Sequence, residues 1–486
     1  MAANFAKRSC ILILSFTLLT VATGASAVRY VNPTTGIDAG ACDVTACQTI
    51  QYAISQAVVG DTVQLSAGTY FENSITISVD LNIVGAGAFS TEIDGQASGP
   101  IFTINANNVL IDKVTLRNGD AGLNFGGAIL FNSGNLFILR SRLLENRALA
   151  GGAIANYSSG HLVIFLSTLQ GNTSSATGGA IACISCGIYG GIDLILSAMT
   201  DNAAGTSGGA LYVDAGLAAS GPVVVWLSAL LRNNANQGGA IYAYGSGIDV
   251  FDSEVSKNEA DSGDGGGIYN AGVVNIERST LAYNTASQLG GAVTVYGSAE
   301  LYTFNSTFSQ NDALCAGGLY LLPNFVVGPV VLIGNTTFYG NEATASGCPQ
   351  HISNDASILD ISNSIIEGGL VVGGVLQPAC TGSFVYTTGT HNRIVDTSCD
   401  NGLADFNLGP VTGLDTNLAF NGGLTRTHNL IYKPWGLNPV VSNAIDMGEN
   451  VFCPAVDQRA KPRPVDHIPI VVGGVPQCDI GAVELQ

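Results

Sequence analysis

The sequence predicts an all-β protein of the parallel β-helix class, a solenoid in which each coil contributes a few short strands. One spacing recurs eight times: a Ser or Thr is followed five positions later by an Asn, with one large apolar residue between them. Successive Asn residues in these copies lie 25 to 31 positions apart. Such self-similarity is the signature of a repeat architecture. The copies are Ser141/Asn146, Ser167/Asn172, Ser197/Asn202, Ser228/Asn233, Ser253/Asn258, Ser279/Asn284, Ser306/Asn311 and Thr336/Asn341.

The segment before each Ser is the second observation, because it is too short and too rich in β-formers for a helix. Residues 162–166 and 223–227 are typical. Alignment on the Ser reveals two apolar columns that lie two residues apart, which is the period of strands with one buried face. The columns are Ile138, Ile164, Leu194, Val225, Val250, Ile276 and Leu136, Leu162, Ile192, Val223, Ile248, Val274.

Gly-Gly pairs and the repeated Asn mark the corners between strands. Gly allows positive φ and close backbone approach, and an inward Asn can bond backbone groups and the Asn of the next coil. We therefore expect structural ladders at both positions. Coils stacked at about 4.8 Å give a core of roughly 40 Å for eight coils. The pairs are Gly126-Gly127, Gly151-Gly152, Gly178-Gly179, Gly208-Gly209, Gly238-Gly239 and Gly290-Gly291.

Residues 28–95 are expected to form an N-terminal cap and the first coils. Ile50, Ala53, Ile54 and Ala57 share one face of a short predicted helix, which would cover the open end of the first coil and block edge-to-edge growth. The stretch contains Thr49-Ile50-Gln51, Gly60-Asp61-Thr62, Gly68-Thr69-Tyr70 and Ile83-Val84-Gly85-Ala86-Gly87. With these residues it resembles the opening of secreted right-handed parallel β-helix proteins, including pectate-lyase-like ones. The resemblance implies the right-handed fold and not the lyase activity.

Residues 96–375 carry the repeats. The interval from Gly-Gly to Ser varies, so we expect the extra length in loops on one side of the rod, where binding usually occurs. Gly-Gly-Ala-Ile combined with Phe308-x-x-Asn311 and Phe338-x-x-Asn341 resembles the repeats of polymorphic outer-membrane adhesins. That resemblance concerns repeat geometry more than role.

A different module is expected over residues 376–486. Its marks are Leu408-Gly409-Pro410, Asn421-Gly422-Gly423, Thr427-His428, Ala444-Ile445-Asp446, Asp457-Gln458-Arg459, Arg463-Pro464-x-Asp466 and Cys478-Asp479-Ile480-Gly481-Ala482-x-Glu484. These motifs, in this order, resemble the choice-of-anchor Q domain of secreted bacterial β-helix proteins. In that family the module is commonly followed by a surface-sorting signal. Here the chain stops two residues after Glu484, which favours free secretion or capture by another route.

We interpret the module as a C-terminal cap closed by a disulfide and by ion pairs. Arg459 and Arg463 are expected to pair with Asp446, Asp466 or Asp479. The alternative is a cation site built from these three carboxylates, which would suit Ca²⁺. No other cofactor is expected.

Composition and the N-terminus indicate export. Residues 1–27 have the pattern of a signal peptide: a basic start, an apolar run too short to span a bilayer, and a small-residue cleavage site before Val28. An N-terminal core helix is the alternative. The net charge of −19 argues against nucleic acid as a partner, and acidic polysaccharides would be repelled unless a cation bridges them. We expect an extracellular monomer, free or associated with a cell surface, without a transmembrane segment.

The ten Cys residues after the signal are even in number and fall as neighbours, as expected for disulfides in an exported chain. The alternative for Cys183-x-x-Cys186 is a redox or metal pair, but a loop clamp fits an oxidising compartment better. The predicted pairs are Cys42/Cys47, Cys183/Cys186, Cys315/Cys348, Cys380/Cys399 and Cys453/Cys478.

Catalysis would need two carboxylates at a fixed separation, since glycosidases act through such a pair. Asp193 and Asp249 occupy one outward column two coils apart, or roughly 9.6 Å at the strand spacing, near the upper limit for an inverting pair. A solvated surface pair is the plainer interpretation. The polar stretch 261–265 resembles a fragment of a calcium loop, but a turn explains it equally well.

An outward aromatic strip is the most suggestive surface feature. The column two residues before each Ser contains Phe165, Trp226, Phe251 and Phe304, and Glu277 interrupts it. Exposed apolar strips often mark a binding surface for a partner or a sugar, although a long loop could cover this one. The sequence therefore favours a non-catalytic, adhesin-like protein that binds a glycan, matrix or surface partner. The alternatives are a polysaccharide-degrading enzyme, hydrolase or lyase, and a structural spacer.

Overall fold

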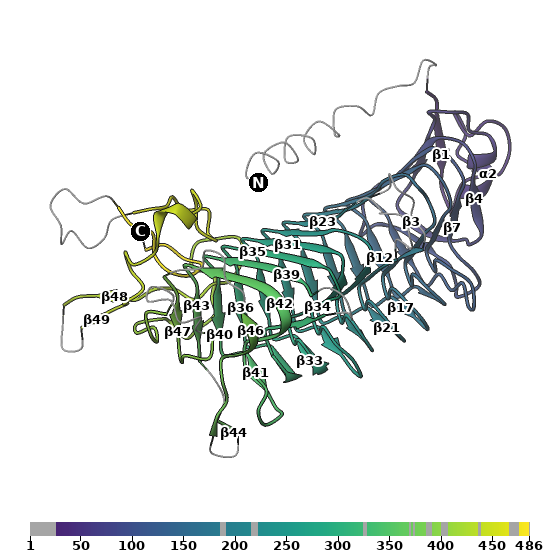
Figure 1. Ribbon diagram of the computed structural model, residues 1–486. Coiled ribbons are helices and arrows are strands. Elements are labelled where there is room, and N and C mark those ends of the chain that lie inside the picture. Colours follow the sequence, from purple (N-terminus) through teal and green to yellow (C-terminus); the bar gives the residue numbers. More distant parts are fainter. Residues whose placement is uncertain are drawn as a thin grey trace.

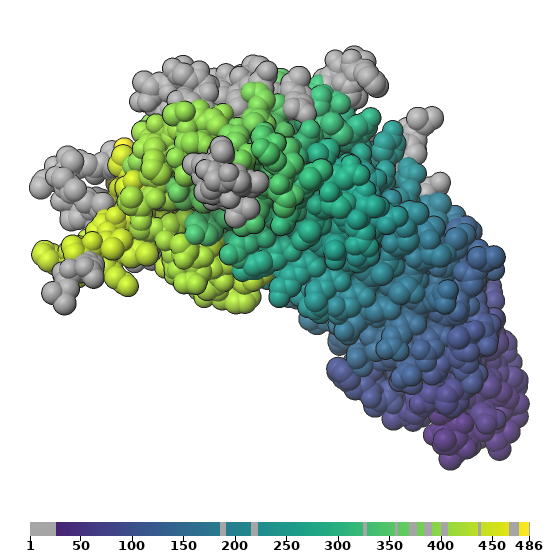
Figure 2. Space-filling view, turned by 90° about the horizontal axis from the view of Figure 1, so that it is seen from below, coloured from purple at the N-terminus to yellow at the C-terminus, as the bar shows by residue number. Residues whose placement is uncertain are grey.

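The computed structural model shows a right-handed parallel β-helix that is almost free of α-helix (Figure 1). It describes residues 26–184, 191–214, 222–323, 328–368, 371–372, 375–384, 391–399, 407–435, 439–465 and 476–485. The fold class predicted from the repeats is thus confirmed. The coils run from the N-terminal end, purple in Figures 1 and 2, to a yellow-green C-terminal module at the other end of the rod.

Each full coil passes through four strands, which stack on those of neighbouring coils as four parallel sheets. Sheet I follows the Gly-Gly corner, sheet II follows sheet I, sheet III follows the Ser and sheet IV follows the Asn. Sheet I contains β4 (Ile75–Ile77), β7 (Phe102–Ile104), β10 (Ile129–Phe131), β14 (Ile154–Asn156), β18 (Ile181–Ile184), β22 (Leu211–Asp214), β26 (Ile241–Tyr244), β30 (Ile268–Ala271), β34 (Val293–Tyr296), β38 (Leu319–Leu322), the start of β42 (Ile352–Ser362) and β46 (Cys380–Phe384). Sheet II contains β1 (Val28–Val31), β2 (Thr62–Leu65), β5 (Leu81–Gly85), β8 (Asn108–Asp112), β11 (Asn135–Leu139), β15 (Leu162–Phe165), β19 (Ile192–Ile195), β23 (Val223–Trp226), β27 (Ile248–Phe251), β31 (Val273–Glu277), β35 (Glu300–Phe304), β39 (Val330–Gly334) and the end of β42.

Sheets III and IV consist of shorter strands. Sheet III contains β3 (Gly68–Phe71), β6 (Thr91–Asp94), β9 (Thr115–Arg117), β12 (Arg142–Leu144), β16 (Thr168–Gln170), β20 (Ala198–Thr200), β24 (Ala229–Leu231), β28 (Glu254–Ser256), β32 (Thr280–Ala282), β36 (Thr307–Ser309), β40 (Thr337–Tyr339), β43 (Ile365–Glu367) and β47 (Arg393–Ile394). Sheet IV contains β13 (Arg147–Ala148), β17 (Thr173–Ser174), β21 (Ala203–Ala204), β25 (Asn234–Ala235), β29 (Glu259–Ala260), β33 (Thr285–Leu289), β37 (Asp312–Cys315) and β41 (Glu342–Ala343). Two small antiparallel pairs, β44 (Val371–Val372) with β45 (Val375–Leu376) and β48 (Tyr432–Lys433) with β49 (Val440–Val441), lie outside the coils.

The repeated Asn forms the predicted ladder inside the rod. In each step the side-chain carbonyl of one Asn accepts two hydrogen bonds from the Asn of the preceding coil. Asn202 Oδ1 accepts from the backbone N and Nδ2 of Asn172, both at 3.0 Å, and Asn202 Nδ2 donates to Asn233 Oδ1 at 2.9 Å. All eight ladder Asn residues are buried, so the ladder satisfies backbone groups that water cannot reach.

The repeated Ser has a parallel role that was not predicted. Ser197 Oγ accepts a hydrogen bond from the backbone N of Ser167 at 3.0 Å and donates to the carbonyl of Ile195 at 2.8 Å. The same pattern recurs along the corner. A small hydroxyl thereby closes the turn between sheets II and III, which explains why the Ser-to-Asn spacing is constant.

His351 ends the Asn ladder. Its Nδ1 lies 3.1 Å from Asn341 Nδ2 and must accept that hydrogen bond, so its Nε2 donates to the carbonyl of Gly368 at 2.5 Å. Complete burial lowers the pKa of His351 to about 4. The folded protein therefore holds a neutral imidazole.

The stability of the protein should fall as the pH drops from 6.5 to about 4, because His351 binds a proton in the unfolded chain but stays neutral in the folded protein over this pH range. This group contributes roughly 3 kcal/mol across that window. In His351→Gln the amide oxygen can still accept from Asn341 but does not titrate. Denaturant unfolding at pH 7 and pH 5 should show a smaller pH dependence for this variant than for the wild type, and an equal dependence would contradict the role of His351.

The Gly-Gly corners approach the next coil as closely as predicted. A Cβ on Gly239 would lie 2.3 Å from the carbonyl oxygen of Gly266, closer than any side chain tolerates. Its neighbour Gly238 has a φ of 62°. Both positions therefore require Gly.

The predicted N-terminal helix is present as α2 (Ile50–Ser55). Thr49 caps it by accepting a hydrogen bond from the backbone N of Tyr52 at 3.3 Å, and the carboxylate of Glu72 accepts from the backbone N of Ile50 at 2.8 Å. A carboxylate at a helix N-terminus is favourable. The helix buries Ile50, Ala53 and Ile54 against the first coils, as expected.

The C-terminal module packs against the last coils and also extends back along the outer side of sheet III. Gln458 Oε1 accepts a hydrogen bond from Thr307 Oγ1 at 2.6 Å, and His428 Nε2 lies 2.8 Å from Ser309 Oγ. A second apolar cluster joins module and rod. Its buried members are Ile365, Leu414, Leu430, Ala444, Ile445 and Ile480. The module thus covers a flank of the β-helix as well as its end.

Four of the five predicted disulfides are formed: Cys42–Cys47, Cys315–Cys348, Cys380–Cys399 and Cys453–Cys478. The fifth involves Cys186, which lies outside the described residues, as do residues 1–25 of the predicted signal peptide. Within the described ranges, no helix has the length and apolar character needed to cross a membrane.

Candidate binding surfaces

The predicted aromatic column exists on the outer face of sheet II. Phe165, Ile195, Trp226 and Phe251 are register partners on consecutive strands, and Glu277 and Phe304 follow. The four aromatic side chains are half-buried. Part of the loop suggested as their cover, 215–221, lies outside the described residues.

The corner next to this strip carries an unusual set of residues. From β8 onward, the position after each sheet II strand has a positive φ, a conformation that Asn and Asp tolerate better than other side chains. Three consecutive coils place Leu there: Leu166, Leu196 and Leu227, with φ of 49°, 49° and 51°. The other coils use polar residues, namely Lys113, Arg140, Asp252, Arg278, Asn305, Asn335 and Asn363.

These leucines are unfavourable twice over. A left-handed backbone costs a non-Gly residue roughly 1 kcal/mol, and Leu166 and Leu196 are 49% and 43% exposed to water. The positive φ belongs to the corner itself, because the other coils share it, but the exposure of Leu166 and Leu196 does not serve the fold, since those coils place polar side chains there. The apolar ridge formed by the three leucines is therefore a functional candidate.

The C-terminal module turns this ridge into a groove of about 450 Å³. Phe420 and Leu424, 66% and 63% exposed, line it together with the three leucines. Ala198 and Ala229 on sheet III leave room because their side chains are small. The groove is thus built from segments about two hundred positions apart in the sequence.

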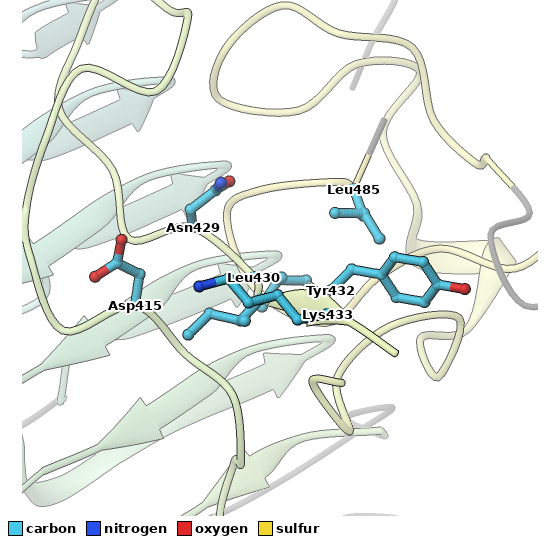
Figure 3. Close-up of a pocket in the computed structure, with 7 residues that line it drawn as sticks. Asp415, Asn429, Leu430, Tyr432, Lys433 and Leu485 are labelled. Atoms are coloured by element: carbon cyan, nitrogen blue, oxygen red, sulfur yellow. The ribbon is translucent and has the colours of Figure 1, made fainter. Parts of the chain in front are cut away.

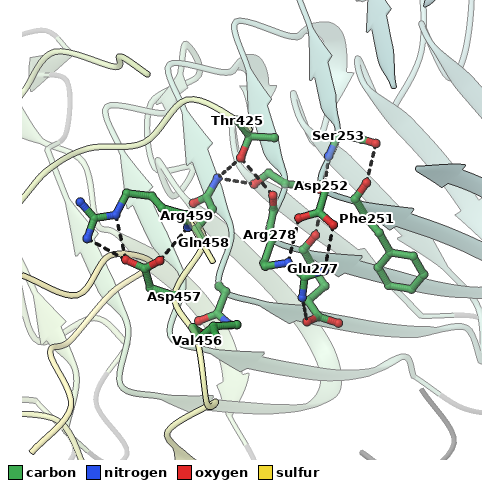
Figure 4. A network of polar contacts seen from close by, with 12 residues as sticks. Phe251, Asp252, Ser253, Glu277, Arg278, Thr425, Val456, Asp457, Gln458 and Arg459 are labelled. Atoms are coloured by element: carbon green, nitrogen blue, oxygen red, sulfur yellow. Dashed lines mark hydrogen bonds and ion pairs between the residues drawn. The ribbon is translucent and has the colours of Figure 1, made fainter. Parts of the chain in front are cut away.

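Carboxylates close one end of the groove, and each is held by an arginine. Asp252 Oδ1 lies 2.8 Å from Arg278 Nε, and Glu254 Oε1 lies 2.5 Å from Arg426 Nη2. Burial raises the pKa of neighbouring Glu277, which also pairs with Arg278. Figure 4 shows Asp252, Glu277 and Arg278 together with Thr425 of the module, which donates a hydrogen bond to the carbonyl of Arg278 at 3.0 Å. The arginines fix the carboxylate positions, which suits binding of hydroxyl groups.

Asp193 and Asp249 lie in one column as predicted, with Val224 between them. Asp193 Oδ2 is 3.7 Å from His161 Nδ1, and Asp193 raises the pKa of that histidine. Asp249 is only 5% exposed and accepts a hydrogen bond from Asn275 Nδ2 at 2.6 Å. Neither carboxylate lines the corner groove, so their catalytic role stays a hypothesis without a described substrate cleft beside it.

A row of tyrosines on the outer face of sheet I was missed. Tyr212, Tyr242 and Tyr269 are register partners whose rings stack at centroid distances of 5.3 and 5.0 Å, and Tyr296 continues the row at 6.4 Å. Burial raises the pKa of Tyr212 to about 12. The sequence does contain a pattern that predicts this row, because a Tyr follows the first Gly of three corners by four positions. Alignment of the repeats on the Ser does not reveal this pattern.

The charged cluster of the module pairs its two arginines with carboxylates that were not predicted. Arg459 Nη2 lies 2.8 Å from Asp457 Oδ2, and Arg463 Nε lies 3.4 Å from Glu484 Oε2, with both Arg463 and Glu484 fully buried. Asp479 instead accepts hydrogen bonds from backbone N groups. Glu484 lies within ion-pair distance of Arg463, and the charge of Asp479 also acts on that guanidinium.

The three carboxylates proposed for Ca²⁺ are only partly described. Asp479 Oδ1 accepts a hydrogen bond from the backbone N of Asp446 at 2.7 Å, so these two residues are neighbours. Asp466 lies outside the described residues. Among residues that the structure describes, no three His, Cys, Asp or Glu side chains form a metal-binding group.

A second cavity, of about 520 Å³, opens on the module itself. In Figure 3, Asp415 and Asn429 lie on one side of it and Tyr432 and Leu485 on the other. Its lining is mixed, without the continuous apolar surface of the corner groove.

The corner groove therefore combines an apolar floor with fixed polar groups at one end. A pyranose has the matching character, since its C–H face is apolar and its edge carries hydroxyls. No protein-family model matches the chain, and no curated protein matches its sequence.

Proposed function

We propose that this chain is a secreted, adhesin-like β-helix protein that binds an extended glycan in the corner groove and leaves it chemically unchanged. The observation that carries the proposal is the apolar ridge of Leu166, Leu196 and Leu227, of which Leu166 and Leu196 are exposed at a corner where the other coils are polar. Disulfides support an extracellular location. The likeness of the last eighty or so residues to choice-of-anchor Q domains supports association with a cell surface.

The groove runs along the rod axis, so successive sugars of an unbranched glycan can contact successive coils. Leu196 and Leu227 would contact the C–H faces of the sugars, and Phe420 would cover them from the module side. Asp252 and Glu254 would accept hydrogen bonds from sugar hydroxyls. The paired state of both carboxylates favours binding over acid–base chemistry, because an ion-paired carboxylate is a weak general acid or base.

Leu196→Asn/Leu227→Asn tests this proposal without harming the fold. Asn suits a positive φ, so the unfolding free energy should stay equal or rise slightly, whereas the affinity for a glycan selected on an array should fall at least about tenfold. Leu123→Asn, an 83% exposed leucine outside the groove, is the matched control and should bind like the wild type.

The same samples separate the alternatives. Wild-type affinity in the double variant would rule out the groove. Release of reducing sugar that disappears in Asp193→Asn would show an enzyme, and the absence of both binding and turnover across the array would favour a spacer.

A further inference from the structure

We propose that the tyrosine row of sheet I is a second binding surface, which takes an extended polysaccharide bearing protonated amines. It lies on a different sheet from the corner groove and does not depend on the groove's function. Its members are Tyr212, Tyr242, Tyr269 and Tyr296, with 48% exposed Tyr244 beside them.

The stacking leaves hydroxyls, not ring faces, for recognition. Rings at 5.0 to 5.3 Å and interplanar angles of 3° and 10° cover each other's faces. Within the described chain, the hydroxyls of Tyr242 and Tyr269 have no hydrogen-bond partner, and neither is among the buried polar atoms that lack one. Tyr242 is half-buried and Tyr269 is 8% exposed, so both rings are largely covered while their hydroxyls keep contact with solvent at the surface of the row.

The spacing of the row selects the kind of polymer. The rings of Tyr212, Tyr242 and Tyr269 repeat once per coil, at centroid distances of 5.3 and 5.0 Å. An equatorially linked pyranose chain advances by close to this distance per sugar, so each sugar can meet one tyrosine. An extended peptide presents same-face residues every two positions, about 6.7 Å apart, and drifts out of register.

The charges around the row favour a positively charged ligand. Asp214 Oδ2 lies 3.3 Å from the hydroxyl of Tyr212, and the charge of Asp264 contributes to the raised pKa of Tyr269. Glu259 and Asp261 are exposed a few positions before Gly265, at the corner that leads into the strand of Tyr269. The five strands β22, β26, β30, β34 and β38 contain no Lys or Arg. An amine-bearing glycan fits this field, and a polyuronate does not.

The test is calorimetric titration of the full mature chain with chitosan hexasaccharide. Tyr242→Phe/Tyr269→Phe removes two hydroxyls and keeps the ring stack, so the fold should be unchanged while the affinity falls at least about tenfold. Tyr302→Phe, whose hydroxyl donates to Glu300 on sheet II, is the matched control and should bind like the wild type. Binding should weaken with added salt.

Wild-type affinity in the double Tyr variant would overturn the proposal. If fully N-acetylated chitin hexasaccharide bound as tightly as chitosan hexasaccharide, the protonated amines would not matter for binding. If oligolysine bound as tightly as chitosan hexasaccharide, the match between sugar spacing and tyrosine spacing would not matter. Leu196→Asn/Leu227→Asn should retain chitosan binding, so that failure of the groove and failure of the tyrosine row can be told apart.

Discussion

Asn233→Ala is expected to lower the free energy of unfolding by about 3–5 kcal/mol, because it leaves several buried groups without partners. Asn202 loses the acceptor of both its backbone N and its Nδ2, at 3.1 and 2.9 Å. The carbonyl of Met199 loses a donor at 3.0 Å. Water cannot replace these bonds because the ladder is completely buried. Guanidinium unfolding followed by circular dichroism measures the loss.

Asn236→Ala provides the matched control for the ladder. Asn236 is exposed three positions later and donates one hydrogen bond, to the carbonyl of Gly205. Its loss should change stability by no more than about 0.5 kcal/mol. Similar effects of the two substitutions would mean that the Asn ladder does not hold the coils together.

Arg463→Met should release the C-terminal module while the rod stays folded. Arg463 and Glu484 are both fully buried, so removing the cation leaves an uncompensated carboxylate, at a cost of about 3–5 kcal/mol. Hydrogen exchange should then rise across residues 407–485 and not in the Asn ladder. Because Phe420 and Leu424 belong to the module, glycan binding in the groove should weaken as well.

The effect of Arg463→Met should depend on pH. Burial, and then the charge of Glu484, raise the pKa of Asp479 to about 8, and burial also raises the pKa of Glu484. The folded module therefore favours protonated carboxyls, so loss of the arginine should matter less at pH 5 than at pH 8. Lys461→Met, an exposed cation two residues away, is the control and should leave module exchange unchanged at both pH values.

The sequence predicted the features that repeat. Asn172, Asn202 and Asn233 fall over one another because equal spacing places them at the same corner of successive coils. The same reasoning predicted that Phe165 and Trp226 share a column. The alignment on Ser concealed the tyrosine row, since the Gly-to-Ser interval varies, whereas Tyr212, Tyr242 and Tyr269 each lie four positions after the first Gly of their corner.

Features that depend on a single long-range contact were beyond prediction. The groove needs Leu227 and Phe420 to meet, and no periodicity relates the module to the rod. Arg463 pairs with Glu484 near the C-terminus and Arg459 pairs with Asp457 two positions away, and no repeat describes either segment. A positive φ at Leu166 is likewise invisible in a sequence, because Leu gives no sign of that conformation.

The stacking of coils in register is tested most directly by a distance between spin labels on sheet IV. Arg147 and Glu259 are exposed and lie in one column, four register steps apart. With labels at Arg147→Cys and Glu259→Cys, the structure predicts a single narrow distribution near the backbone separation of about 19 Å. A broad distribution would contradict the stacked solenoid. So would a distance that differs from this value by more than the length of the two label side chains.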